Sequence, residues 1–470
     1  MKNFNKNLFV YGLIPLITKA SGFILLPVYV LFLDSNDFGY MELFLTLFSF
    51  ATLLINSEIY TAIGRFFYET KEFEEKRKLI SSGLIITLFL AIVVVVILHF
   101  FSDYILKYYI RDISQFNFYF IGIFYVFFNA ISTYLSVIPR YDNKAKIFTI
   151  INILAVLVKI FTILFFLFYL DFGLISVILG HLFQVIFSTI CFIFINKNYI
   201  KFSIELNYIT KIIKYSGRLI PYIFLIGFWE PFSRFLLVDY FSNSQIGLLN
   251  FTLRLASLLE LINTAIHMTW MPLLFENKDN ENFKSDTVKI SHSISVLILS
   301  IIIIFSLASP EIISLINANE FKDSMFILNL ILLLNYFKIM VRMRGYLPYT
   351  NNKVYILSLA QLLSYIISGL FLLYFKNEFG ILGMAFFIML PSAINYLFLT
   401  LYTSFQGQIS FLSSKENILL FFCFCLSFIF FLSENFFIRY FLIGIVFLFL
   451  IVENKFFKMT FKLIAESKKK

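Results

Sequence analysis

Long apolar stretches follow one another along almost the whole chain, separated by short polar segments. A helix needs about 20 consecutive, mostly apolar residues to cross the hydrocarbon core of a bilayer. The first stretch, residues 8–33, exceeds that length and contains one charged residue, Lys19. Charged residues make up 14% of the chain, against about 25% in an average soluble domain. The pattern predicts an all-α integral membrane protein with no room for a soluble catalytic domain.

The stretches predict about 14 transmembrane helices. The first is too long, and too directly followed by another, for a cleaved signal peptide, so we expect it to be retained. The predicted spans are residues 8–33, 39–63, 79–101, 115–138, 147–170, 173–195, 213–239, 245–271, 288–309, 323–347, 354–375, 379–403, 417–433 and 436–456.

The basic residues are distributed unevenly between alternate loops. With a cytoplasmic N-terminus, 28 of the 38 Lys and Arg residues fall in cytoplasmic segments, 5 in outside segments and 5 within spans. The positive-inside rule therefore predicts that both termini are cytoplasmic. This topology, with a basic tail close to anionic lipid, accounts for the net charge of +10 without a nucleic-acid partner.

The residues that usually carry chemistry form no pattern. Three cysteines (Cys191, Cys423 and Cys425) lie inside apolar stretches, and the four histidines are scattered, so no metal, disulfide or redox cofactor is predicted. No GxxxxGK[ST] motif occurs, which excludes ATP as the direct energy source. Membrane-embedded polymerases and glycosyltransferases need a large outside loop with catalytic carboxylates, and no predicted outside loop exceeds about a dozen residues. We expect a transporter rather than an enzyme.

The hydrophobic pattern begins again near residue 208. The segment Tyr11-Gly-Leu-Ile-Pro15 matches Tyr215-Ser-Gly-Arg-Leu-Ile-Pro221, Asp34-Ser-Asn-Asp-Phe-Gly39 matches Ser242-Asn-Ser-Gln-Ile-Gly247, and Phe67-Tyr-Glu69 matches Leu274-Phe-Glu276. Each copy contains an even number of spans, so the copies share one orientation and are related by an axis along the membrane normal. We expect six-helix bundles over residues 1–207 and 208–410, followed by two helices and a basic tail over residues 411–470.

The same segments resemble a known family. The chain is similar to the Wzx-type polysaccharide repeat-unit flippases of the MATE-like multidrug/oligosaccharidyl-lipid/polysaccharide (MOP) exporter superfamily. The segments that carry the resemblance are Phe23-Ile-Leu-Leu-Pro-Val-Tyr29, Asp34 to Gly39 with Tyr40-Met-Glu-Leu-Phe44, Ile220-Pro221, Ser233-Arg234-Phe235, Ile246-Gly247, Arg254-Leu-Ala-Ser257 and Trp270-Met-Pro-Leu-Leu-Phe-Glu276. Such flippases often carry an acid just before the arginine of the seventh span, where this chain has Ser233, so an ion-coupling role for that acid does not carry over.

Five basic residues lie within predicted spans: Lys19, Lys159, Arg234, Arg254 and Lys338. A charge in the membrane interior is costly and normally faces a cavity or a partner. At 3.6 residues per turn, Asn250, Arg254, Ser257, Glu260 and Asn263 share one side of their helix, and Asn335, Lys338 and Arg342 share another. We therefore predict a cationic, substrate-binding cavity formed by Lys19, Arg234, Arg254 and Lys338.

Other interpretations of these residues stay open. Glu230 lies four residues before Arg234 and is suited to an intrahelical ion pair that would leave Arg234 no substrate role. Lys159 is suited to reaching the membrane surface or pairing with another helix. His267 fits a packing residue better than a proton carrier. Glu58, Glu230 and Glu260 are the candidate ion-coupling residues.

The resemblance implies a function. The cargo of that family is an undecaprenyl-diphosphate-linked oligosaccharide, which we expect this chain to flip across the bacterial cytoplasmic membrane by alternating access. The implied partners are membrane lipid and, as candidates, a polysaccharide polymerase and a chain-length regulator. A cationic cavity fits the diphosphate. The rivals are a MATE-type drug or metabolite antiporter, which predicts an acidic cavity, and a lipid II flippase on the same fold.

Overall fold

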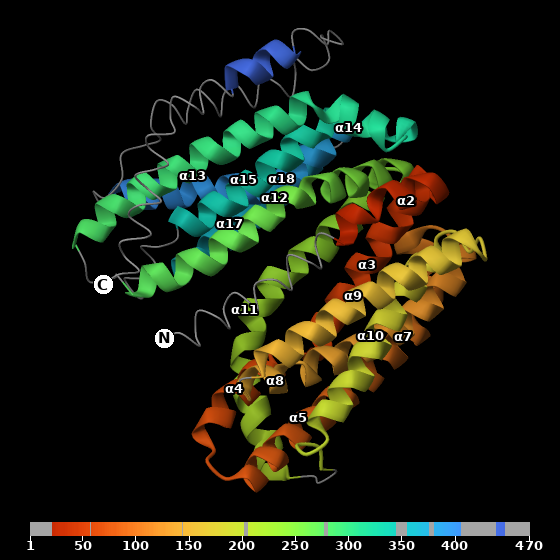
Figure 1. Ribbon diagram of the computed structural model, residues 1–470, viewed down its shortest axis with the longest axis vertical. Helices are drawn as coiled ribbons and strands as arrows, with labels where there is room; N and C mark the ends of the chain where they lie inside the picture. Colours follow the sequence, from red (N-terminus) through yellow and green to blue (C-terminus); the bar gives the residue numbers. More distant parts are fainter. Residues whose placement is uncertain are drawn as a thin grey trace. The chain divides into compact units, whose positions relative to one another are not determined.

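The computed structural model describes residues 21–56, 58–142, 144–201, 205–276, 281–344, 355–375, 380–405 and 439–446. Throughout these residues the secondary structure is helical, with no strand (Figure 1). The predicted all-α fold is confirmed.

Nine helices in the described part of the chain are long and apolar enough to cross a membrane, and each overlaps one predicted span. Helices α11 (Leu206–Val238) and α15 (Ser324–Arg344) cover two further predicted spans and are long enough to cross, but they carry charges along their length. Half of the first predicted span, all of residues 417–433 and most of residues 436–456 lie outside the described residues.

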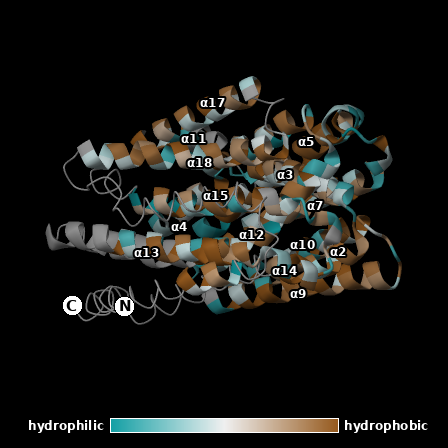
Figure 2. Cartoon of the chain, turned by 90° about the horizontal axis from the view of Figure 1, so that it is seen from above, coloured by the Kyte–Doolittle hydropathy of each residue, from teal (hydrophilic) through white to brown (hydrophobic). Residues whose placement is uncertain are grey.

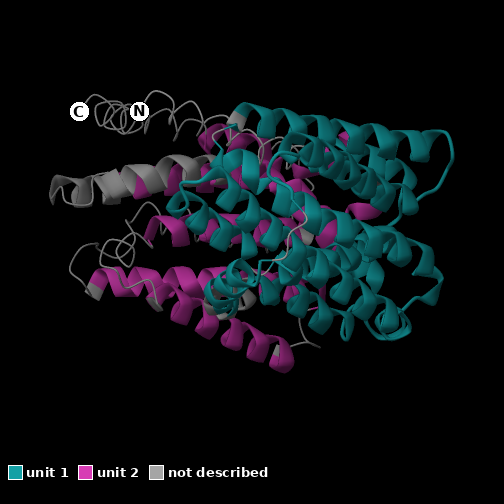
Figure 3. Cartoon of the chain, turned by 90° about the horizontal axis from the view of Figure 1, so that it is seen from below, with its two compact units in different colours: residues 1–247 teal, residues 248–470 magenta. Residues whose placement is uncertain are grey.

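The helices group into two compact units, residues 1–247 and 248–470 (Figure 3). The division lies 40 residues beyond the boundary that we predicted from the repeat, because α11 packs against α3, α4 and α5. The helices of the first unit are α2 (Leu26–Phe32), α3 (Ser35–Asn56), α4 (Ile59–Glu69), α5 (Phe73–Phe100), α6 (Ser102–Tyr104), η1 (Ile105–Ile110), η2 (Ile113–Gln115), α7 (Phe116–Leu135), α8 (Val137–Tyr141), α9 (Ala145–Phe168), α10 (Ile175–Asn196) and α11.

The long helices of the first unit carry apolar side chains on all sides, because one face of each helix packs against other helices and the opposite face contacts lipid. On α9 the buried face includes Ala155 and Ile163, and Ile163 packs against Gly180 of the neighbouring α10. The opposite face exposes Leu154, Leu157 and Phe161, at 44%, 54% and 72%. Figure 2 shows apolar residues along most of this helix. An apolar face of this kind is stable only in a hydrocarbon solvent, so the chain is a multi-pass membrane protein.

The second predicted span is broken into α3 and α4 at Glu58. This residue has a φ of 58°, in the left-handed region. Its carboxylate accepts hydrogen bonds from the hydroxyls of Tyr60, at 2.6 Å, and Thr61. The side chain thus replaces part of the helical hydrogen bonding that the break removes.

The turns before α3 and α12 (Asn243–Glu276) have the same construction. Asp34 and Asp37 bond each other's backbone N–H groups at 2.8 and 3.3 Å, and Ser242 and Gln245 do the same at 3.2 and 3.0 Å. Each is a capping box, which fixes where a helix begins. These are the two turns that the sequence repeat aligns.

The two aligned turns also contact each other, within the first unit. A Cβ on Gly39 would lie 2.0 Å from the carbonyl oxygen of Asn243, and a Cβ on Gly247 would lie 1.7 Å from that of Ser35. In the repeat register Gly39 matches Gly247 and Ser35 matches Asn243, so the two contacts are related by the repeat. Both sites need glycine because backbone occupies the space of a side chain.

The second unit contains most of α12, α13 (Glu281–Leu307), α14 (Ser309–Leu315), η3 (Asn319–Phe321), α15, α17 (Tyr355–Phe375), α18 (Gly380–Phe405) and the helical residues 439–446. Helix α15 packs against α13 and α18. Arg439 is 6% exposed and bonds both carboxylate oxygens of Glu311, at 2.7 and 2.8 Å, and the carbonyl of Leu307 at 3.0 Å. This ion pair fastens residues 439–446 to the end of α13 and the start of α14.

Candidate functional site

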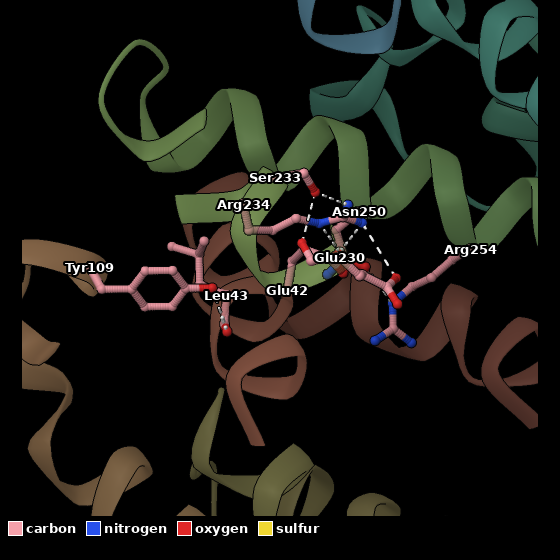
Figure 4. Close-up of polar contacts among 8 residues, drawn as sticks. All are labelled: Glu42, Leu43, Tyr109, Glu230, Ser233, Arg234, Asn250 and Arg254. Atoms are coloured by element: carbon pink, nitrogen blue, oxygen red, sulfur yellow. Dashed lines mark hydrogen bonds and ion pairs between the residues drawn. The ribbon is translucent and has the colours of Figure 1, made fainter. Parts of the chain in front are cut away.

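The charged centre of the first unit is an ion pair between α11 and α3. The Nε and Nη2 atoms of Arg234 donate to one oxygen of Glu42, at 2.9 and 2.7 Å (Figure 4). The side chains are only 5% and 14% exposed. Removing one partner of such a pair leaves a buried, uncompensated charge and typically costs about 3–5 kcal/mol.

Neighbouring groups on α11 hold Arg234 in place. Its Nη1 donates to the hydroxyl oxygen of Ser233 at 3.1 Å, and that hydroxyl donates to the carbonyl of Glu230 at 2.7 Å. The carboxylate of Glu230 lies 3.8 Å from Nη2 and is 71% exposed. One guanidinium is therefore shared by a buried and an exposed carboxylate.

Tyr109 of η1 contacts both of the helices that carry the ion pair, α3 and α11. Its hydroxyl donates to the carbonyl of Leu43 at 3.3 Å, and its ring stacks on Phe235 with 6.3 Å between centroids. Glu42 and Arg234 therefore lie on backbone segments that Tyr109 ties together.

The sequence predicted that Glu230 would be the partner of Arg234, as the alternative to a free cation. The structure adds Glu42 as the closer partner, which the sequence analysis missed. No local spacing relates two residues 192 positions apart. The one signal was that Glu42 is a charged residue within a predicted span, in the segment Tyr40 to Phe44 that carries the family resemblance.

In the second unit, Arg254 lies on the polar face of α12, as its spacing predicted. Its Nε donates to the side-chain oxygen of Asn250, one turn earlier, at 3.2 Å. Arg254 and Glu260 are both half-buried.

Lys338 and Arg342 form the exposed face of α15. Between Ile327 and Arg344, Lys338 and Arg342 are the two exposed residues, and all the others are buried or half-buried. Asn335, one turn before Lys338, is buried and donates to the carbonyl of Ile331 at 3.3 Å. Lys338 is 14 residues from the start of α15, about 21 Å along the helix axis at 1.5 Å per residue. An ammonium group this far along a span calls for water or an anion beside it.

The remaining residues that the sequence singled out either make other contacts or lie outside the residues that the structure describes. Lys159 is 6% exposed and donates to the hydroxyl of Ser21 at 3.1 Å, so it pairs with another helix. Glu58 is held at the α3–α4 break by Tyr60 and Thr61. Lys19 and the side chain of His267 lie outside the described residues. No group of three or more His, Cys, Asp or Glu residues is arranged to hold a metal ion in the part of the chain that the structure describes.

Residues 30–326 match the family described as "Polysaccharide biosynthesis protein". The chain belongs to this family. The match covers more than half of its 470 residues, including Glu42, Arg234 and Arg254. The comparison with curated proteins found no match.

Solved membrane transporters have the same fold as this chain. The structure "Lipid II flippase MurJ, inward closed conformation" is 15% identical with a TM-score of 0.74, and the match covers 95% of this chain and 99% of that one. An inward-facing multidrug resistance MATE family transporter of the MOP superfamily is 13% identical with a TM-score of 0.65, and the match covers 86% and 100%. An outward-facing structure with the same description is 13% identical with a TM-score of 0.53 and covers 85% and 95%. The expected MATE-like fold is confirmed.

Proposed function

We propose that this chain flips an undecaprenyl-diphosphate-linked oligosaccharide across the bacterial cytoplasmic membrane by alternating access. The observation that carries the proposal is the family match over residues 30–326, on a fold shared with membrane transporters. Its orientation follows the positive-inside rule, with both termini in the cytoplasm. A polysaccharide polymerase and a chain-length regulator are the partners that this function calls for.

The cationic side chains bind the diphosphate in this mechanism. Lys338 and Arg342 present two cations on the exposed face of α15, and Arg254 adds a third on α12. Lysine and arginine form charge-assisted hydrogen bonds with phosphate, and these are stronger where water is scarce. Lys19 is the fourth candidate. The lipid tail stays in the bilayer while the head group crosses.

Arg234 differs from these cations because Glu42 and Glu230 already compensate its charge. It contributes to the cationic cavity when its pair with Glu42 opens, which makes the pair a switch between two transport states. Protonation of Glu230, Glu58 or Glu260 is the candidate coupling step, since protonation of a carboxylate removes its hold on a cation. No direct use of ATP is proposed.

A second candidate, a lipid II flippase, is favoured by the similarity to the MurJ structure. Its cargo carries the same diphosphate, so the cationic side chains would serve either substrate. A MATE-type antiporter for cationic drugs would instead need acids to outnumber bases at the exposed face of α15, where the residues are Lys338 and Arg342.

Purified protein in vesicles tests the assignment. Vesicles carrying a fluorescent undecaprenyl-diphosphate oligosaccharide, lipid II or a cationic dye are compared for transfer of the label across the membrane. We expect transfer of the oligosaccharide lipid at the highest rate. Faster transfer of lipid II would favour the second candidate, and transport of the dye alone would reject both.

A further inference from the structure

A cluster of cations lies at the end of the first unit where α4 ends and α11 begins. The guanidinium of Arg65 lies 5.9 Å from the ring centre of Phe66 and 4.8 Å from that of Tyr215. The ammonium of Lys211 lies 4.6 Å from the same Phe66 ring. Two cations from helices far apart in sequence thus meet at one aromatic ring.

These cations outnumber the carboxylates that accompany them. Arg65 pairs with Glu69 at 3.2 Å, and this exposed ion pair is the only one that Arg65 forms among the described residues. Lys211 and Lys214 are exposed, and neither has a carboxylate within 4.0 Å among the described residues. Of the nearby acids, Glu74 pairs with Arg77 and Lys201, and Glu205 pairs with Lys78. Glu72 and Glu75 lie near Tyr208, one turn before Lys211, but neither forms an ion pair with Lys211 or Lys214 among the described residues.

The aromatic rings fix the positions of the cations. Phe66 is 6% exposed, so its ring is held by packing, and a cation above a fixed ring loses some of its freedom. Lys214 is three residues after Lys211, hence on the same face of α11. Like charges at such spacing repel one another, and a bound anion removes that repulsion.

The position of the cluster along the membrane normal indicates which anion reaches it. The sequence after α4 (residues 70–78) and before α11 (residues 197–205) is rich in charged and polar residues, so we expect this end of the unit to lie at the phosphates of a bilayer. The aliphatic stems and rings below the charges suit a lipid, and the charges suit its phosphate.

We propose that Arg65, Lys211 and Lys214 form a binding site for the phosphate of a lipid head group at the cytoplasmic surface. The assignment to that surface rests on the orientation in the proposed function. The phosphate belongs either to the diphosphate of the cargo lipid before it is flipped or to an anionic phospholipid of the bilayer. The site shares no residue with the Glu42–Arg234 pair or with the candidate cations Arg254 and Lys338.

The amount of lipid that the purified full-length protein retains tests whether this site binds lipid. The protein is incubated with undecaprenyl diphosphate or with phosphatidylglycerol in a neutral detergent, and the bound lipid is counted by native mass spectrometry. The double variant Arg65→Gln/Lys211→Gln should lower the apparent affinity about thirtyfold, because each basic residue near a phosphate surface contributes a factor of about five. Lys214→Gln should lower it by a smaller factor.

Lys76→Gln is the matched control. Lys76 lies over the Phe67 ring at 4.4 Å at the same end of the unit, but outside the proposed site. It should retain lipid as the wild type does. An equal loss in Lys76→Gln would mean a general attraction to basic residues, and no loss in the double variant would mean that these cations do not bind the lipid. Either result would overturn the site.

Two further comparisons separate the sources of the phosphate. Tighter retention of undecaprenyl diphosphate assigns the site to the cargo, and tighter retention of phosphatidylglycerol assigns it to the bilayer. Displacement of both by millimolar inorganic phosphate would mean a free-phosphate site and overturn the lipid assignment. If the wild-type protein retains lipid normally but does not transfer the oligosaccharide lipid in vesicles, the proposed function alone is rejected. If it transfers that lipid but the variants retain as much lipid as the wild type, this site alone is rejected.

Discussion

Arg234 and Glu42 are 192 residues apart in the sequence, yet their side chains meet at 2.7 Å in a nearly dry environment. The pair joins the helix that opens the second half of the repeat to one in the first half. The basic residue that sequence patterns single out as a substrate cation is therefore already compensated in this structure.

The two partners of the pair should not be equivalent when neutralised. Arg234→Gln leaves Glu42 buried without a cation and should cost about 3–5 kcal/mol. Glu42→Gln should cost less, because Glu230 remains 3.8 Å from Arg234. Thermal unfolding of the purified variants in detergent measures both. A larger loss in Glu42→Gln than in Arg234→Gln would contradict the sharing of one guanidinium.

The glycines of the two aligned turns should be equally intolerant of a side chain. Gly39→Ala and Gly247→Ala each place a methyl group within about 2 Å of a backbone carbonyl, so both should lower the yield of folded protein. Gly217→Ala is the control, because no atom lies within 4 Å of its Cβ position. It should be neutral or stabilising, since alanine is favoured over glycine within a helix by about 1 kcal/mol. Size-exclusion profiles of the membrane extracts compare the three, and a normal profile for Gly39→Ala would count against the close contact.

Backbone strain at Glu58 predicts a difference between two substitutions. Both Glu58→Ala and Glu58→Gly lose the hydrogen bonds from Tyr60 and Thr61, but glycine adopts a φ of 58° without strain. Glu58→Gly should therefore be more stable than Glu58→Ala by about 1 kcal/mol. Equal melting temperatures would mean that the helix break does not persist in the membrane protein.

The Arg439–Glu311 pair should control the attachment of residues 439–446. Glu311→Gln keeps hydrogen-bonding atoms but leaves Arg439 buried with less compensation, so a protease should cut this segment faster. Asp323→Asn is a suitable control because it neutralises an exposed acid that is not a partner of Arg439. Limited proteolysis of the two variants in detergent, followed by mass spectrometry, compares the rates, and equal rates would argue against the tether.

Much of the fold was predictable because the bilayer sets the length of each apolar stretch. The nine candidate spans among the described residues overlap the predicted ones, and the ends differ where a helix continues into polar sequence: α3 and α4 cover residues 35–69, against a predicted span of 39–63. The break at Glu58 was not predicted. Neither proline nor glycine occurs there, and left-handed backbone at a glutamate leaves no trace in the apolar pattern.

The site was predictable only as far as helix periodicity reaches. The spacing of 3.6 residues per turn placed Asn250 beside Arg254 and Lys338 beside Arg342, and the structure has both arrangements. The partner of Arg234 depends on how α3 packs against α11, which no local rule supplies. The cluster of Arg65 and Lys211 was hidden for the same reason, since its residues were counted only as loop charges.

Transfer of a fluorescent undecaprenyl-diphosphate oligosaccharide across vesicle membranes, compared between wild type and Lys338→Gln, tests the central claim most directly. The exposed Lys322, near the start of the same helix, provides the control Lys322→Gln. The cationic mechanism predicts that Lys338→Gln lowers the rate about tenfold, as expected for one lost charge-assisted hydrogen bond to phosphate, while Lys322→Gln transfers normally. Normal transfer by a stably folded Lys338→Gln variant would contradict the mechanism.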